Sequence, residues 1–128
     1  MTEPRTILIV DDASLVRLYY RSALEEAGFQ VHEALNGLEA LEKLTTLAVD
    51  LLIVDINMPQ MDGLTFLKTV RRGELPGAGV PALVTSTESK PADFAAAREA
   101  GANFYIPKPL DREQLVTYAT LLSGAAHG

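Results

Sequence analysis

The sequence predicts a doubly wound α/β domain with a five-stranded parallel sheet, and three observations support this. Short apolar runs rich in Ile, Val and Leu alternate with amphipathic stretches that carry apolar residues at three- and four-residue spacing. Five such pairs follow one another along the chain. The amphipathic stretches have the length of the helices that join parallel strands by right-handed crossovers.

The first two strand and helix pairs occupy the N-terminal third of the chain. The apolar run TILIV, residues 6–10, is the first strand, and a helix follows over 13–27. Gly28 ends that helix, because glycine readily adopts the left-handed conformation found there. The second strand, 29–34, is half-polar, as is usual at a sheet edge. The second helix begins at Asn36 or Gly37 and runs to residue 44.

The third strand, DLLIVD at 50–55, is the most continuously apolar run, which predicts a central position covered on both faces. A helix follows over 63–72. Asp62 is a suitable N-cap for this helix, so we interpret Asp62 and Gly63 as a cap and turn and assign Asp62 no chemistry.

The last two pairs complete the domain. Residues 73–79 form a loop, the fourth strand covers 81–86, the fourth helix covers 92–100, the short fifth strand covers 103–106, and the final helix covers 111–122. We find no linker, repeat or low-complexity tract. Residues 1–128 are therefore predicted to be a single domain with its core between about residues 5 and 123.

Composition narrows the class of protein. The 128 residues include no Cys, which fits a reducing cytoplasm and leaves no thiolate metal site. No signal-peptide pattern or membrane-length apolar run is present, so we expect no membrane association. The net charge of -6 argues against direct binding to nucleic acid, which requires a basic surface.

Polar residues stand at the carboxyl ends of four strands, where sheets of this class bind ligands. Asp11 and Asp12 end the first strand, Asp55 the third and Ser86 the fourth, and Lys108 follows the fifth. We expect these side chains to meet at one edge of the sheet. Alone, the Asp11–Asp12 pair would be an ordinary helix-capping pair, and only its company with Asp55 and Lys108 favours a functional site.

This combination of groups predicts phosphoryl chemistry. Three adjacent carboxylates repel one another, so one would bind a proton unless a cation lies among them. Oxygen ligands without a nearby His or Cys favour Mg²⁺. Lys108 and Ser86 can bind phosphoryl oxygens without attacking phosphorus. Asp55 remains as the nucleophile, which would form an aspartyl phosphate.

The motifs LIVDD, IVDINMPQMDG, LVTST and YIPKP resemble those of the two-component response-regulator receiver domain, and the resemblance covers almost the whole chain. It implies a flavodoxin-like (βα)5 fold of the kind also called CheY-like, with the strand order 2-1-3-4-5. It also implies that Asp55 receives a phosphoryl group from a histidine kinase. In the family, Asp11, Asp12 and Asp55 would hold Mg²⁺ together with the backbone carbonyl of Asn57.

The resemblance further implies a switch. The Ser86 hydroxyl would swing toward the phosphoryl group, and the Tyr105 ring would move inward. Taken alone, Ser86 could equally be a turn residue at the end of a strand. Tyr105, taken alone, is more often an aromatic residue of the core or its rim than a switch. We also expect a cis peptide between Lys108 and Pro109, since X-Pro bonds adopt cis at little cost.

Residues next to the site are expected to affect how fast the acyl phosphate forms and is hydrolysed. Asn57 and Glu88 stand two residues after Asp55 and Ser86, as in chemotaxis-type receivers, and could orient a water that hydrolyses the acyl phosphate. This predicts a short-lived phosphorylated state. Thr87 departs from the Ala or Gly usual in the family, and its branched side chain would narrow the mouth and slow turnover.

The expected output is protein contact through the face formed by the fourth helix, fifth strand and fifth helix. We expect a monomeric, CheY-like stand-alone receiver of the chemotaxis type, controlling a flagellar motor. It would catalyse only its own phosphorylation and dephosphorylation. A phosphorelay or phosphate-sink receiver, or a receiver fragment of a longer transcription factor, is the alternative. The kinase, the target and the oligomeric state after phosphorylation are left open by the sequence.

Three other readings concern individual residues. Arg17 and Arg21, four apart on the first helix, are interpreted as a solvated face, with kinase docking as the alternative. A phosphohydrolase of the haloacid-dehalogenase type would need a proton donor where Asn57 stands, and Asn57 cannot donate one. A flavin-binding protein would need a glycine-rich phosphate loop after the first strand, and none is present.

Overall fold

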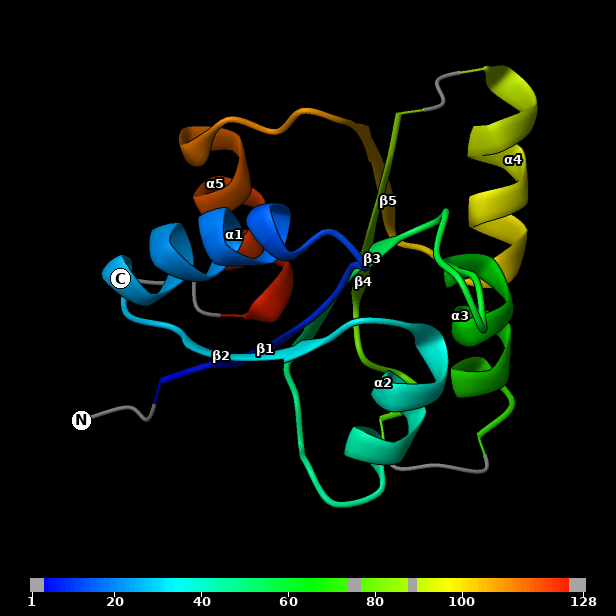
Figure 1. Cartoon of the computed structure of the whole chain (residues 1–128), viewed down its shortest axis with the longest axis horizontal. Helices are drawn as coiled ribbons and strands as arrows, with labels where there is room; N and C mark the ends of the chain where they lie inside the picture. Colours follow the sequence, from blue (N-terminus) through cyan, green and yellow to red (C-terminus); the bar gives the residue numbers. More distant parts are fainter. Residues whose placement is uncertain (1–3, 74–76, 88–89, 125–128) are drawn as a thin grey trace.

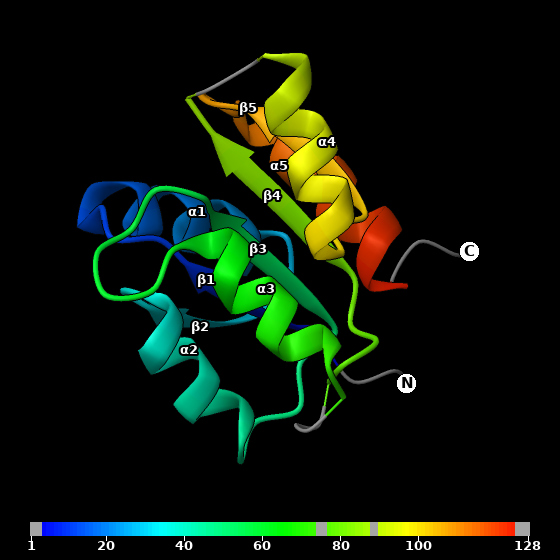
Figure 2. The same cartoon turned by 90° about the vertical axis from the view of Figure 1, so that its right-hand side faces the viewer.

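A computed structural model describes residues 4–73, 77–87 and 90–124. The sheet is parallel throughout, in the order β2-β1-β3-β4-β5, which confirms the predicted fold class and strand order. Figures 1 and 2 show its arrangement. The elements are β1 (Thr6–Val10), α1 (Ser14–Glu26), β2 (Gln30–Ala34), α2 (Gly37–Leu44), β3 (Leu51–Asp55), α3 (Gly63–Arg71), β4 (Ala82–Ser86), α4 (Pro91–Ala100), β5 (Phe104–Pro107) and α5 (Arg112–Ser123).

Helices cover both faces of the sheet, with α1 and α5 on one side and α2, α3 and α4 on the other (Figure 1). Each strand contributes side chains to both faces of the sheet, because successive side chains along a strand point to opposite faces. Leu52 and Val54 of β3 pack in the core beneath α2, α3 and α4, whereas Leu51 and Ile53 pack beneath α1 and α5. Every residue of β3 is buried, as its apolar run predicted.

Side-chain caps define several helix starts. Asn36 accepts a hydrogen bond from the Glu39 amide at 2.9 Å, so α2 begins at Gly37. Asp62 accepts one from the Thr65 amide at 2.9 Å. These bonds satisfy amides that have no partner inside the helix.

The element boundaries lie within about a residue of those predicted. α4 starts one residue earlier than expected, at Pro91, because proline suits the first turn, where no amide donor is required. β5 is shifted by one residue to Phe104–Pro107. Asn103, just before it, still contacts β4, because its amide donates to the Ala82 carbonyl at 2.9 Å and its side-chain oxygen accepts from the Ala82 amide at 2.9 Å. Within the described ranges, none of the helices combines the length and apolar character needed to cross a bilayer.

Candidate functional site

The carboxyl ends of the strands bring the acidic residues together. Carboxylate oxygens of Asp11, Asp12 and Asp55 all lie within 4.8 Å of one another. Asp11 and Asp55 are buried, and Asp12 is exposed to solvent. Asp11 is fixed in part by its own turn, because its carboxylate accepts a hydrogen bond from the Ala13 amide at 2.9 Å. The cluster is therefore open on one side, where a ligand can enter.

Lys108 reaches into this cluster from the loop after β5. Its Nζ lies 2.9 Å from Asp11 Oδ2 and 3.2 Å from Asp55 Oδ1. The Lys108 amide donates a hydrogen bond to the Ser86 carbonyl at 2.7 Å, which ties this loop to the end of β4. The Lys108–Pro109 peptide is cis. The ammonium thus bridges two carboxylates that come from different strands.

The charges in the cluster do not balance. Burial is the largest cause that raises the pKa of Asp55, and the neighbouring Asp11 carboxylate adds to it; although Lys108 opposes both, the pKa is raised to about 6. Burial alone would disfavour the Lys108 ammonium, but Asp11 and Asp55 outweigh it and raise the pKa of Lys108. One lysine is therefore not enough to neutralise the acidic residues, and a further cation would be bound favourably here.

The loop between β3 and α3 is held close to the Asp55 backbone. The Gly63 amide donates to the Ile56 carbonyl at 2.9 Å. A Cβ at position 63 would lie only 2.2 Å from the Asp55 carbonyl oxygen, so the loop can close only with glycine there. Gly63 is thus more than the turn residue that the sequence indicated. Asn57, in the loop between Ile56 and Gly63, is exposed to solvent.

Of the residues assigned to switching and turnover, Ser86 and Thr87 lie at the end of β4 and Tyr105 lies within β5. Ser86 is fully buried at the end of β4, and Thr87 is exposed. Tyr105 of β5 is partly buried, and its ring meets Phe94 of α4 edge to face, with 4.5 Å between ring centroids. Glu88 lies outside the described residues.

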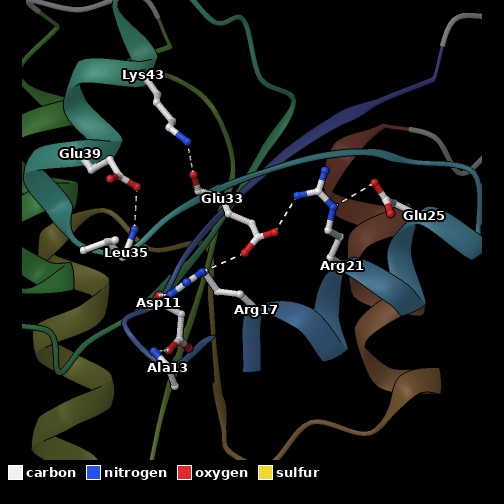
Figure 3. A network of polar contacts seen from close by, with 9 residues as sticks. All are labelled: Asp11, Ala13, Arg17, Arg21, Glu25, Glu33, Leu35, Glu39 and Lys43. Atoms are coloured by element: carbon white, nitrogen blue, oxygen red, sulfur yellow. Dashed lines mark hydrogen bonds and ion pairs between the residues drawn. The ribbon is translucent and has the colours of Figure 1, made fainter. Parts of the chain in front are cut away.

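A polar network behind Asp11 was not foreseen from the sequence (Figure 3). Arg17 Nη1 donates to the Asp11 carbonyl at 2.6 Å, and Arg17 Nε pairs with Glu33 at 2.9 Å. Arg21 Nη1 pairs with the same carboxylate at 2.6 Å, and Lys43 donates to the Glu33 carbonyl. These bonds lower the pKa of Glu33 despite its burial.

The prediction that Arg17 lies on a solvated face is therefore wrong, since its side chain is only 15% exposed. Glu33 is the reason, because the edge strand β2 runs beside the start of α1 and places a carboxylate against that helix. The only sequence signal was a charged residue near the end of an otherwise half-apolar strand. The network connects α1, β2 and α2 behind the Asp11 backbone.

Comparisons with known proteins agree with this geometry. Residues 7–120 match the family described as the response regulator receiver domain. Response regulator MprA of Mycobacterium ulcerans is 36% identical over 110 residues, which are 86% of this chain and 46% of that protein. The CAI-1 autoinducer sensor kinase/phosphatase CqsS of Vibrio cholerae is 32% identical over 112 residues, 88% of this chain and 16% of that protein.

The solved structures agree as well. Chemotaxis protein CheY4 of Vibrio cholerae superimposes with a TM-score of 0.87 at 32% identity, over 93% of this chain and 98% of that one. The chain spans less than half the length of these two curated relatives.

Proposed function

This chain belongs to the response-regulator receiver family of two-component signalling, and from that membership we propose that Asp55 accepts a phosphoryl group from a histidine kinase in a reaction that requires Mg²⁺. One observation carries the proposal. The Asp55 carboxylate stands at the end of a buried strand, with two other carboxylates within 4.8 Å and the Lys108 ammonium 3.2 Å away. A carboxylate in that setting is a nucleophile surrounded by groups that bind phosphoryl oxygens.

Each residue of the site has its own role in the phosphoryl transfer. An Asp55 oxygen attacks phosphorus in line, the bond between phosphorus and the donor imidazole nitrogen breaks, and an acyl phosphate forms on Asp55. Lys108 turns from the carboxylates to an oxygen of the transferred group and stabilises its charge. The Ser86 hydroxyl donates to another phosphoryl oxygen. Hydrolysis reverses the modification, because water attacks phosphorus and the bond to Asp55 breaks.

The acidic cluster fits a magnesium ion. Asp11, Asp12 and Asp55, with the Asn57 backbone carbonyl, would hold it, and all of these ligands are oxygens. Burial, and after it the Asp11 carboxylate, raise the pKa of Asp55 to about 6. A divalent cation would offset both effects, because it favours the charged carboxylate. The ion, when bound, supplies a positive charge next to the oxygens of the transferring group.

The phosphorylated protein would signal by contact through the face of α4, β5 and α5. A groove of about 330 Å³ opens on this face, lined by aromatic side chains that include Phe94, Phe104 and Tyr105. Tyr105 belongs to β5 and lines the groove. Inward movement of its ring would therefore change the shape of the groove. We propose a chemotaxis-type role in the control of a flagellar motor, which the likeness to CheY4 supports.

The proposal also covers the lifetime of the phosphorylated state and the form in which the protein acts. Asn57 and Glu88 would shorten the lifetime of the acyl phosphate, and Thr87, exposed at the mouth, would lengthen it. The protein would act as a cytoplasmic monomer with no substrate other than its own phosphoryl donor. A relay or phosphate-sink role is the second candidate, because part of the sensor kinase/phosphatase CqsS is 32% identical to this chain.

The test follows intact mass during incubation with acetyl phosphate, with and without Mg²⁺. Wild type should gain one phosphoryl group only with Mg²⁺, and Asp55→Asn should gain none. Asp62→Asn, which removes a carboxylate from an exposed helix cap, is the matched control and should behave as wild type. Rapid loss of the added mass would favour the chemotaxis role over a relay. No gain of mass, either with acetyl phosphate or with purified histidine kinases, would refute the proposal.

A further inference from the structure

The backbone of Asp11 is held from three directions just after the end of β1. Its amide donates to the Ala34 carbonyl at 3.1 Å, at the point where β2 ends. Its carboxylate accepts from the Ala13 amide at 2.9 Å. Its carbonyl lies past the paired part of the two strands, and a side chain supplies its hydrogen bond: Arg17 Nη1 donates to it at 2.6 Å (Figure 3). The Asp11 peptide groups are therefore fixed in direction.

Arg17 is itself held in place by Glu33 of β2. One oxygen of the Glu33 carboxylate accepts from Arg17 Nε at 2.9 Å, and the other pairs with Arg21 Nη1 at 2.6 Å. Arg21 also pairs with Glu25 at 3.1 Å. In this group two guanidiniums are balanced by two carboxylates. The contact between Arg17 and Asp11 therefore fixes geometry and does not neutralise the acidic cluster.

Asp12 depends on this arrangement for its position. The Asp11 carbonyl and the Asp12 amide belong to one rigid peptide plane, so the bond from Arg17 sets the direction in which the chain leaves β1. Asp12 is exposed, and among the residues that the structure describes no hydrogen bond or ion pair holds its carboxylate. One of its oxygens nevertheless lies within 4.8 Å of oxygens of Asp11 and Asp55. The backbone, and not a side-chain contact, keeps Asp12 in the cluster.

We propose that Arg17, supported by Glu33, is a positioning residue for Asp12. Through the peptide that joins Asp11 to Asp12, it keeps the Asp12 carboxylate directed toward the place where a cation would bind. Groups that orient metal ligands from behind commonly set the affinity of a site. The inference rests on the proposed function, in which these carboxylates hold Mg²⁺. It predicts that Arg17 affects metal affinity without contacting the reacting groups.

The first test titrates the protein with MgCl₂ and follows its ¹⁵N–¹H amide signals by NMR, with no phosphoryl donor present. Arg17→Met keeps an aliphatic stem and loses the donors, and it should weaken Mg²⁺ binding about tenfold. Arg21→Met removes the other arginine that pairs with Glu33 and is the matched control, which should bind as wild type does. In an Asp12→Asn background, Arg17→Met should have no further effect. An unchanged affinity, an equal loss in Arg21→Met, or the same loss in the Asp12→Asn background would overturn the proposal.

A double variant serves if Arg17→Met does not fold. Arg17→Met combined with Glu33→Leu removes both members of the pair, so neither is left as an uncompensated charge. Arg21 keeps Glu25 as a partner in this variant. The double variant should lose as much Mg²⁺ affinity as we expect for Arg17→Met alone, and an affinity equal to that of wild type would overturn the proposal.

The second test measures the rate of phosphorylation by acetyl phosphate at increasing Mg²⁺ concentration. Arg17→Met should need more Mg²⁺ to reach half of its maximal rate, and its rate at saturating Mg²⁺ should approach that of wild type. A lower maximal rate with an unchanged Mg²⁺ requirement would overturn the positioning role. If Arg17→Met loses Mg²⁺ affinity as expected but wild type is never phosphorylated, the proposed function fails and the role of Arg17 stands. If wild type binds no Mg²⁺, both fail.

Discussion

Replacing Asp55 by Asn should stabilise the metal-free protein, and by an amount that depends on pH. The pKa of Asp55 is about 6 in the folded protein and 3.8 in an exposed reference state. The folded state therefore holds a proton that the unfolded state releases between these values, and the free energy of unfolding falls as the pH rises from about 4 to about 6. The difference of about two pH units corresponds to about 3 kcal/mol.

Asn cannot ionise, so the unfolding free energy of Asp55→Asn does not fall in this way as the pH rises. Urea unfolding in chelator between pH 4 and pH 8 should give a difference in unfolding free energy, variant minus wild type, that grows by about 3 kcal/mol and levels off near pH 7. Added Mg²⁺ should stabilise wild type and narrow the difference, since it binds the folded state. Asp62→Asn controls for the loss of one carboxylate. A difference that is constant with pH, or that shrinks as pH rises, would refute the reasoning about the cluster.

Three further variants probe the framework around the site. Gly63→Ala places a methyl group 2.2 Å from the Asp55 carbonyl, so it should lower unfolding free energy by about 1–3 kcal/mol and abolish phosphorylation; normal phosphorylation kinetics would contradict the close approach. Phe66→Ala empties a fully buried position beneath α3 and should cost about 3–5 kcal/mol in urea unfolding; a loss below about 1 kcal/mol would mean that the core is not packed as described. Asp111→Ala removes the α5 cap, whose carboxylate accepts from the Gln114 amide at 2.7 Å, and should cost about 1 kcal/mol without changing the phosphorylation rate; an altered rate would place α5 in the chemistry.

The fold was accessible from the sequence because its signals are local. The apolar run of β3, the caps Asn36 and Asp62, and the terminating Gly28 each depend on a few neighbouring residues, and together they determine the order of elements. The convergence of Asp11 and Asp55 followed from topology, since parallel strands present their carboxyl ends at one edge.

Contacts between elements were the part that the sequence did not reveal. The Glu33 carboxylate pairs with Arg17 because β2 lies beside α1. Tyr20 is buried because the face of α1 that carries it packs in the core with residues of the sheet and of α5. Both cases depend on the packing angle between a helix and the sheet, and a periodic apolar pattern does not specify that angle. The role of Gly63 was missed for a related reason, because a steric contact with a strand backbone leaves no compositional signal.

The most direct measurement locates the phosphoryl group within the chain. After incubation with acetyl phosphate and Mg²⁺, borohydride reduces an acyl phosphate to an alcohol, and peptide mapping by mass spectrometry identifies the reduced residue. We expect homoserine at Asp55 alone. Reduction at Asp11 or Asp12, or at none of the three in protein that has gained the mass of a phosphoryl group, would contradict the assignment of Asp55 as the phosphoacceptor.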